Sequence, residues 1–386
     1  MRTAATLSGA RSSRRRSRSW GPCVTPSVDA RPASAAPTAL KSGTGIQGST
    51  SQERSMKLGT ILLWGEDLSL FRQQVRLAEE LGYSVIGVGD SPAAWNELYV
   101  SLAVAAGQSH RATLTPMVTT PGLRHPSVTA GAMSSLHQLT GGRVVLTIGS
   151  GGSAVGSVGR KAAGQREMRT YVEAVRSLLG GGSAEVDGRT AVPLQQARPV
   201  PIYMSGDGPK ALRLAGEIAD GVVIGLGMAV DVVANKIATV REAANAAGRD
   251  ADAIDVWGLA FTSVRDDPDQ AKSDITAFLA SVGAMGLKAA HMRALIPPEL
   301  RGAVAELEQR YDPRQHVVVG GAGACLVEEL GMVDFLVGLR GVTGTPDQVR
   351  DYAAEIEKLG VTHLLAALPG SADPDGTLRR LARAVR

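Results

Sequence analysis

Aromatic residues, cysteines and long apolar runs are all scarce in this chain of 386 residues. Aromatic side chains make up only 4% of the sequence, so a folded core must depend on Val, Leu, Ile and Ala. The two cysteines, Cys23 and Cys325, do not form a disulfide framework or the C-x2-C spacing of a metal site. No uncharged apolar stretch of about 18 residues occurs, so no membrane span is predicted. The low cysteine content fits a reducing cytoplasm.

A net basic charge is also missing from most of the chain, although the net charge of the whole is +4. Residues 1–55 hold nine Lys or Arg residues against Asp29 and Glu53, a net charge of +7, which leaves −3 for residues 56–386. The basic character therefore belongs to the N-terminal segment. The rest of the chain gives no electrostatic reason to expect a nucleic-acid partner.

The N-terminal segment, residues 1–55, is rich in Ser, Ala, Arg, Pro and Gly and shows no apolar periodicity. Such a segment cannot bury enough apolar surface to offset the entropy lost on ordering, so we predict a disordered basic extension. An organellar transit peptide is one alternative, and a translated upstream stretch with the natural start at Met56 is another. Removing the segment should lower the melting temperature by about two degrees at most.

Residues 56–386 alternate between short apolar runs and amphipathic helical stretches, the pattern of repeated strand–helix units on a parallel sheet. Eight such units predict a single (β/α)8 barrel of the triosephosphate isomerase type. A doubly wound open sheet is the structural alternative, because periodicity does not report closure. Residues 284–342 break the rhythm and are interpreted as an insertion late in the barrel, and a small hairpin is expected around Asp187 and Gly188. The predicted strands are residues 57–63, 85–88, 112–118, 144–148, 201–204, 221–224, 254–263 and 362–366.

Polar and small residues follow several of the predicted strands. In a parallel barrel, binding and catalytic residues gather at the carboxyl ends of the strands. Gly-, Ser- and Thr-rich sequences there are typical of loops whose backbone amides approach a ligand closely. The strand ends that stand out are Trp64, residues 89–91, residues 118–120, residues 149–153 and residues 205–208.

The loop after the fifth predicted strand is followed by a helix with Pro209 at its first position. A strand, a glycine turn and a helix N-terminus together direct free backbone N–H groups at one point, as a phosphate site requires. Lys210 lies in the first turn, where the helix dipole disfavours a cation unless an anion is bound. An ordinary strand–helix turn with a solvated lysine is the alternative. The loop consists of Ser205, Gly206, Asp207 and Gly208.

Among the titratable side chains, Asp90 follows the second strand directly. It has three candidate roles: a proton donor, a hydrogen-bond acceptor for a ring N–H, or the N-cap of a short helix begun by Pro92. His110, His125 and His137 share no spacing that suggests a metal site, so no metal is expected. No G-x-S-x-G element supports Ser-His-Asp chemistry.

Short motifs occupy these strand ends in a fixed order. They are AEELGY at 78–83, GDS at 89–91, VTTPGLRHP at 118–126, GGRVVLTIGSG at 141–151, SAV at 153–155, YMSGDGPK at 203–210, LAG at 214–216 and ADG at 219–221. In this order and in register with the strands, they resemble the luciferase-like oxidoreductases, particularly the branch that includes methylenetetrahydromethanopterin reductase. The resemblance covers about residues 57–280 and resumes at about 340–368.

The resemblance implies a barrel of the bacterial-luciferase type that binds FMN or the deazaflavin coenzyme F420 at the strand ends. It implies a non-proline cis peptide at Met117-Val118, which backs the isoalloxazine ring, and places Asp90 and Ser91 at the reactive edge of the ring as catalytic residues. Trp64 and Trp95 would form walls of the substrate pocket. The remaining residues implied in cofactor binding are Thr119, Gly149, Gly151 and Ser153, with Ser205, Gly206, Asp207, Gly208 and Lys210 around the phosphate.

Two positions depart from the related sequences. Several deazaflavin-dependent relatives carry His where this chain has Ser91, so a histidine proton donor does not carry over. Relatives often place an acidic residue where Gly152 stands, so an acid role in that loop does not carry over either.

These features predict an oxidoreductase that transfers a hydride between F420 and a small organic substrate. The alternative is an FMN-dependent monooxygenase that incorporates oxygen from O2, because both chemistries use the same barrel and the same phosphate loop. A barrel that has lost catalysis is a third hypothesis, and the absent acid at Gly152 is its only support. The expected partners are a small-molecule substrate and a second copy of the chain in a homodimer, with no nucleic acid and no membrane.

Overall fold

The computed structural model describes residues 56–288, 290–312, 321–368 and 373–385. The chain separates into residues 1–52 and 53–386, and all described residues belong to the second part. The predicted N-terminal extension, residues 1–55, lies outside the described residues. In the part of the chain that is described, no helix is long and apolar enough to cross a membrane.

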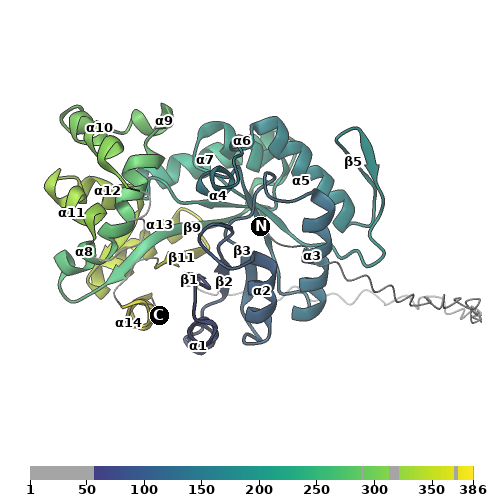
Figure 1. The fold of residues 1–386 in the computed structure, drawn as a ribbon, viewed down its shortest axis with the longest axis horizontal. Helices are drawn as coiled ribbons and strands as arrows, with labels where there is room; N and C mark the ends of the chain where they lie inside the picture. Colours follow the sequence, from purple (N-terminus) through teal and green to yellow (C-terminus); the bar gives the residue numbers. More distant parts are fainter. Residues whose placement is uncertain (1–55, 289, 313–320, 369–372, 386) are drawn as a thin grey trace, which may run out of the picture. The chain divides into compact units, whose positions relative to one another are not determined.

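The central element is a parallel barrel, in which strands neighbour each other in the order β3-β2-β1-β11-β9-β8-β7-β4 (Figure 1). Bridges between Leu114 and Val144 and between Thr119 and Ile148 join β3 to β4 and close the circle. The predicted (β/α)8 barrel is therefore confirmed, and the open-sheet alternative is wrong. The barrel strands are β1 (Lys57–Leu62), β2 (Val85–Val88), β3 (Thr113–Pro116), β4 (Leu146–Gly149), β7 (Ile202–Ser205), β8 (Gly221–Ile224), β9 (Asp255–Val264) and β11 (His363–Ala367).

Helices surround the barrel, and several of them begin at a side-chain cap or a proline. Asp67 accepts hydrogen bonds from the N–H groups of Ser69 and Leu70 at the start of α1, and Pro209 begins α6 as predicted. The surrounding helices are α1 (Leu68–Glu80), α2 (Leu98–Ala106), α3 (Pro126–Thr140), α4 (Ser153–Ser157), α5 (Gln165–Leu179), α6 (Pro209–Ile218), α7 (Val230–Ala246), α8 (Pro268–Ser281), α13 (Pro346–Lys358) and α14 (Pro374–Val385), with the 3-10 turn η1 (Ala251–Ala253).

The predicted hairpin is present as β5 (Ala184–Val186) and β6 (Arg189–Ala191), an antiparallel pair. Its two turn residues, Asp187 and Gly188, have φ of 50° and 73°. A turn with positive φ at both central positions matches the twist of the flanking strands and suits this residue pair. The local sequence alone therefore predicted this element.

The insertion forms a separate helical layer that packs on α8 and around Phe261 of β9, and Figure 1 shows its helices gathered at the end away from the hairpin. It ends in β10 (Gly341–Gly344), which runs parallel to β9 and was not predicted. The four residues of β10 are too few to show a period, and two of them are glycines. The other elements are η2 (Val282–Gly286), α9 (Ala290–Arg293), η3 (Pro298–Leu300), α10 (Arg301–Arg310), α11 (Ala322–Glu329) and α12 (Val333–Arg340).

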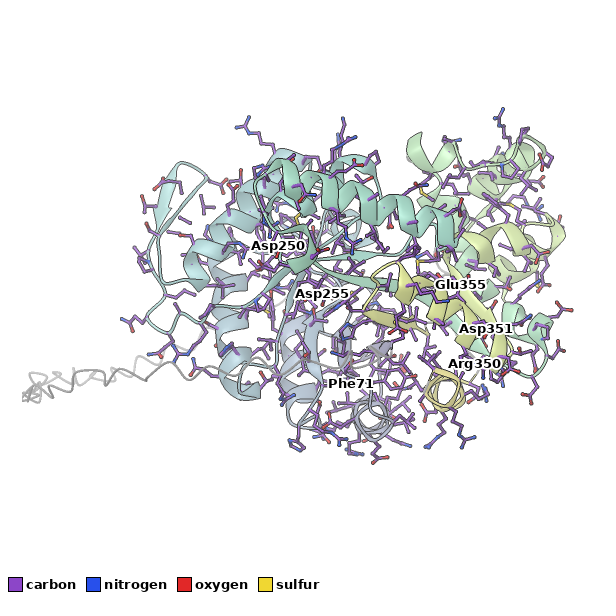
Figure 2. All side chains as sticks on the ribbon, turned by 180° about the vertical axis from the view of Figure 1, so that it is seen from behind. Phe71, Asp250, Asp255, Arg350, Asp351 and Glu355 are labelled. Atoms are coloured by element: carbon purple, nitrogen blue, oxygen red, sulfur yellow. The ribbon has the colours of Figure 1, made fainter. Side chains whose placement is uncertain are left out.

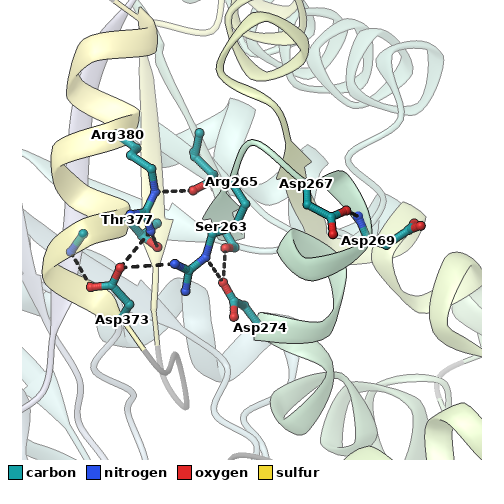
Figure 3. Close-up of polar contacts among 10 residues, drawn as sticks. Ser263, Arg265, Asp267, Asp269, Asp274, Asp373, Thr377 and Arg380 are labelled. Carbon is teal, nitrogen blue, oxygen red and sulfur yellow. Dashed lines mark hydrogen bonds and ion pairs between the residues drawn. The ribbon is translucent and has the colours of Figure 1, made fainter.

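The Arg265 side chain, just after β9, joins the end of this strand to α8, which follows it, and to α14, more than 100 residues away (Figure 3). Its Nε donates to the Asp274 carboxylate of α8 at 2.7 Å, and Ser263 donates to the same oxygen. Its Nη1 lies 3.3 Å from the Asp373 carboxylate, which Arg380 of α14 also contacts at 3.0 Å. The cluster therefore anchors α8 and α14 to the end of β9.

The amino-terminal end of the barrel is closed by a network around Asp255, which Figure 2 shows among the strands. Its carboxylate accepts hydrogen bonds from the Tyr203 hydroxyl at 2.8 Å and from the Trp257 indole at 2.7 Å, as well as from Thr362. His363 lies beside it, with its ring 5.2 Å from that of Trp257. Two of the few aromatic side chains, Tyr203 and Trp257, thus fill this end of the barrel.

The His363 ring gives the fold a pH dependence. Burial lowers its pKa from 6.5 to about 4, with Asp255 opposing the shift and Lys57 adding to it. Because the folded pKa is depressed, the unfolded chain binds more protons between pH 6.5 and 4. Stability from this group is therefore full above pH 6.5 and is lost as the pH falls through 4, by about 3 kcal/mol.

The measurement is urea unfolding of the wild type and His363→Gln across this pH range. The variant should show the shallower dependence on pH, because only the histidine has been removed and all carboxylates remain. Parallel curves for the two proteins would contradict the assignment.

Candidate cofactor and substrate site

The carboxyl ends of β3, β4 and β7 lie side by side at one rim of the barrel. Thr119 pairs with Ile148 across the closure, and Gly149 stands opposite Ser205 in the β4–β7 register. Gly149 has no room for a side chain, because a Cβ atom there would lie 2.8 Å from Cγ2 of Val118. Residues after three of the predicted strands are therefore neighbours at the rim: Thr119 lies next to β4, and Gly149 lies next to Ser205.

The peptide bond between Met117 and Val118 is cis, as the resemblance implied. It follows β3 directly, where the Met117 N–H donates to the Val88 carbonyl at 2.7 Å and the Thr119 N–H donates to the Thr147 carbonyl at 3.1 Å. Met117 is buried inside the barrel, whereas Val118 is half-buried at the rim. The two residues therefore do not both point into the core.

Asp90 lies beside this bulge with its side chain only 2% exposed. One carboxylate oxygen accepts hydrogen bonds from Thr119 Oγ1 at 2.8 Å and from Arg124 Nη1 at 2.6 Å, and the other accepts from Arg124 Nη2 at 3.1 Å. No helix begins at Pro92, where the chain forms a turn, so the N-cap interpretation is wrong. The paired carboxylate is an acceptor, which favours the ring N–H role over proton donation.

Arg124 also belongs to this site, and the sequence did not reveal its role. Its guanidinium also donates to the Glu97 carboxylate at 2.7 Å and lies 4.9 Å from the centre of the Tyr99 ring. Burial alone would lower the pKa of Arg124, but hydrogen bonds and charge from Asp90 outweigh it and raise the pKa. The one sequence signal for Arg124 was its position in the motif at residues 118–126, which follows the end of a predicted strand. Within that motif, no role was predicted for Arg124.

The loop after β4 carries three predicted cofactor residues. Gly149 lies at the rim. Gly151 has φ of 84°, and a Cβ atom on it would lie 2.8 Å from Oγ1 of Thr120, so a side chain has no room there. Ser153 begins α4, but its side chain lies outside the described part of the structure. A Cβ atom on Gly152 would meet nothing within 4 Å, so open space stands where relatives place an acid.

The loop after β7 precedes α6, whose N-cap Gly208 makes no side-chain capping bond. The first N–H groups of α6 therefore have no side-chain partner at the cap. Gly206 lies against this helix, since a Cβ atom there would be 2.6 Å from Cβ of Ala211. Lys210 is exposed in the first turn, as predicted for a basic group at the rim.

Asp207, in the same loop, is engaged by protein groups. Its carboxylate accepts from the Gly225 N–H at 2.8 Å and from the Lys236 ammonium at 2.6 Å. Lys236 comes from α7, is 8% exposed, and also donates to the carbonyls of Leu226 and Gly227. Burial lowers the pKa of Lys236, and the Asp207 charge opposes that shift. Helical periodicity on α7 gave no sign of this role.

The two tryptophans assigned to the substrate pocket stand above β1 and β2. Trp64 follows β1 and stacks on Phe71, with ring centres 6.0 Å apart. Asn96 donates to the Trp64 carbonyl, which links the two loops, and a Cβ atom on Gly89 would lie 3.5 Å from the Trp95 ring. Both tryptophans are half-buried and lie in loops next to the strand that leads to Asp90.

A pocket of about 650 Å³ lies outside the strand ends, between the loop after β3, α5 and the hairpin. Arg124 is one of its walls, together with Arg160 and Arg166. Val118, Gly149 and the loop after β7 do not line it, so it borders the candidate site on the Arg124 side only.

Among the described residues, no group of three or more His, Cys, Asp or Glu side chains is arranged to hold a metal ion. His125 instead caps α3, since its Nδ1 accepts from the Ser127 N–H at 3.2 Å.

Comparisons with known proteins show which family the chain resembles. The model of the luciferase-like monooxygenase family matches residues 43–363. The 5,10-methylenetetrahydromethanopterin reductase of Methanolobus tindarius is 30% identical over 311 residues, covering 76% of this chain and 88% of that protein.

Two solved structures share the fold. The coenzyme F420-dependent tetrahydromethanopterin reductase of Methanopyrus kandleri superposes with a TM-score of 0.68 at 22% identity, covering 86% of this chain and 98% of that one. The oxygenating constituent of 3,6-diketocamphane monooxygenase from Pseudomonas putida, in complex with FMN, gives 0.57 at 18% identity, covering 86% and 98%. This chain belongs to the luciferase-like monooxygenase family, whose members are F420- or flavin-dependent oxidoreductases.

Proposed function

We propose that this protein is an F420-dependent oxidoreductase that transfers a hydride to or from a small organic substrate. The observation that carries the proposal is the continuous rim from Asp90 through Thr119 and Gly149 to the uncapped N-terminus of α6. It offers a ring site at one end and a phosphate site at the other. The dependence of the Methanopyrus kandleri relative on F420 supports the choice of cofactor.

The ring end would lie between Val118 and Asp90. Gly149 leaves that surface free of a side chain, as the close approach of a flat ring requires. The Asp90 carboxylate, oriented by Arg124 and Thr119, would accept a hydrogen bond from a ring N–H, with Ser91 next to it at the reactive edge. F420, when bound, supplies the carbon that gives or receives the hydride. Trp64 and Trp95 would exclude water from the substrate.

The phosphate end would lie at the loop after β7, and Gly206→Leu tests it. The added side chain would collide with Ala211 and displace the first turn of α6 from the phosphate. We expect cofactor affinity to fall by about tenfold or more, equivalent to about 1.4 kcal/mol. Gly302→Leu is the matched control, because a Cβ atom there meets nothing within 4 Å. Fluorescence titration should show equal affinity for the wild type and the control.

The choice between F420 and FMN can be tested at Lys210. F420 carries an acidic oligoglutamyl tail beyond its phosphate, whereas FMN ends at the phosphate. Lys210→Glu should therefore weaken F420 binding more than FMN binding, and added salt should reduce the wild-type preference in the same direction. Equal losses for both cofactors would remove Lys210 as the selecting residue.

An FMN-dependent monooxygenase is the second candidate, supported by the FMN complex of the Pseudomonas putida relative. The same titration separates the two proposals. Tight FMN binding without measurable F420 binding would favour the monooxygenase, and oxygen consumption with reduced FMN would then be measured. Binding of neither cofactor would contradict both. A homodimer stays a prediction, which gel filtration would test.

A further inference from the structure

Arg340, the last residue of α12, carries a charge that the fold does not neutralise. Its Nε atom is buried and has no hydrogen-bond partner. Its guanidinium lies 5.2 Å from the centre of the Phe261 ring in β9, an interaction that satisfies none of its N–H groups. A buried N–H donor without an acceptor costs free energy, because it has lost its hydrogen bond to water.

The surroundings of Arg340 are the ends of β7, β8 and β9. The Leu339 carbonyl accepts from the Gly227 N–H, which fastens the end of α12 to the loop after β8. Burial lowers the pKa of Arg340, and the charge of Asp207, after β7, opposes that shift. An arginine nevertheless stays charged in proteins.

The charges at this position do not balance. Asp207 is the described carboxylate that acts on Arg340, but its hydrogen bonds go to Lys236 and to Gly225. Lys236 and Arg340 therefore face a single described carboxylate, which leaves one positive charge. Lys236 is also occupied by two carbonyls, whereas the buried Nε donor of Arg340 has no acceptor.

We propose that Arg340 binds an anionic group, a carboxylate or a phosphate, carried by the substrate. The guanidinium presents paired donors that match either group in a bidentate arrangement. Arg340 belongs to the insertion, and the charge that acts on it is that of Asp207, in the loop after β7 that would hold the cofactor phosphate. The inference rests on the proposed function and adds to it the class of substrate: a small organic anion.

Inorganic phosphate is the probe, measured by isothermal titration calorimetry at constant ionic strength. The protein is first saturated with F420, so that the loop after β7 is filled. We expect Arg340→Met to weaken phosphate binding by about tenfold or more. Arg340→Lys should keep part of the affinity, because it keeps the charge but loses the paired donors. Arg72→Met, on the exposed side of α1, is the control and should bind as the wild type does.

A second readout excludes a purely structural role. Methionine keeps an apolar contact with Phe261 and removes the buried, unpartnered Nε donor, so the melting temperature of Arg340→Met should be unchanged or higher. A marked loss of stability together with unchanged phosphate affinity would overturn the proposal. Equal phosphate affinity in the wild type and Arg340→Met would overturn it as well, whatever the stability.

The same variants separate the substrate from the cofactor as the source of the anion. If Arg340 serves the substrate, Arg340→Met should change F420 affinity by less than about threefold. A loss of F420 affinity of about tenfold, with phosphate competing against F420, would assign Arg340 to the cofactor and overturn the substrate assignment.

Failure of the proposed function would look different. If F420 binds to none of the proteins, phosphate is titrated into the cofactor-free protein and into Gly206→Leu, in which the loop after β7 is disrupted. Phosphate binding that survives Gly206→Leu but is lost in Arg340→Met would support the anion site while the F420 proposal fails. Binding lost only in Gly206→Leu would overturn the anion site at Arg340.

Discussion

Replacing Arg124 with methionine should lower the free energy of unfolding by about 3–5 kcal/mol. The substitution leaves the Asp90 carboxylate, 2% exposed, with only the Thr119 hydroxyl as a described partner. An uncompensated buried charge costs more than the lost ion pair itself contributed. Cofactor affinity should fall in parallel, because Asp90 would lose the group that orients it beside the ring site. Urea unfolding and fluorescence titration measure the two effects.

The double variant Asp90→Asn, Arg124→Met tests the origin of the loss. Removing both charges should cost clearly less than the sum of the single variants, since neither partner is then left alone. Arg350→Met is the control, because Arg350 pairs with Asp347 on the surface and is 53% exposed; Figure 2 labels it on α13. That loss should stay below about 1 kcal/mol. Additive single losses at Asp90 and Arg124 would contradict the coupling.

Replacing Lys236 with methionine should also lower the free energy of unfolding by about 3 kcal/mol or more. Lys236 and Asp207 are 8% and 12% exposed, so neither charge has water as an alternative partner. The variant would free the Asp207 carboxylate, whose negative charge would then act on the neighbouring phosphate loop. We therefore expect F420 affinity to fall further than the loss of folded protein explains, and salt to reduce the difference.

Lys272→Met is the matched control, because that ammonium pairs with Asp269 and Asp334 on the surface. It should change neither quantity by more than about 1 kcal/mol. Combining Lys236→Met with Asp207→Asn should restore part of both the stability and the cofactor affinity. Restored stability without restored affinity would mean that Asp207 binds the cofactor directly, as the sequence resemblance implied.

The local elements were predictable because their signals are local. The helix Pro209–Ile218 begins where it was predicted to begin, since a proline occupies its first position. The hairpin at Asp187 and Gly188 was predictable for the same reason. By contrast, β10 was missed, because pairing with β9 rather than its own four residues makes it a strand.

The sequence predicted which strand ends carry the candidate site. It did not predict which charged side chains pair with each other there. Arg124 lies 34 residues from Asp90, and Lys236 lies 29 residues from Asp207. No periodicity or motif relates residues at such separations within one sequence. Arg340 lies in the stretch 284–342, which was interpreted as an insertion without any predicted site residues.

The order of short apolar runs and helices along the chain determined by itself that this protein is built of strand–helix units on a parallel sheet, because strand alternation and helical amphipathicity depend on neighbours a few residues away. The tertiary structure decided that the sheet closes into a barrel, through the bridges between β3 and β4. The ordered motifs placed the candidate cofactor residues at one rim, because parallel strands end together. Only the tertiary structure decided which charges those residues meet. Asp90 is neutralised by Arg124, Asp207 by Lys236, and Arg340 by no described group, since charge pairing depends on distance in space and on burial.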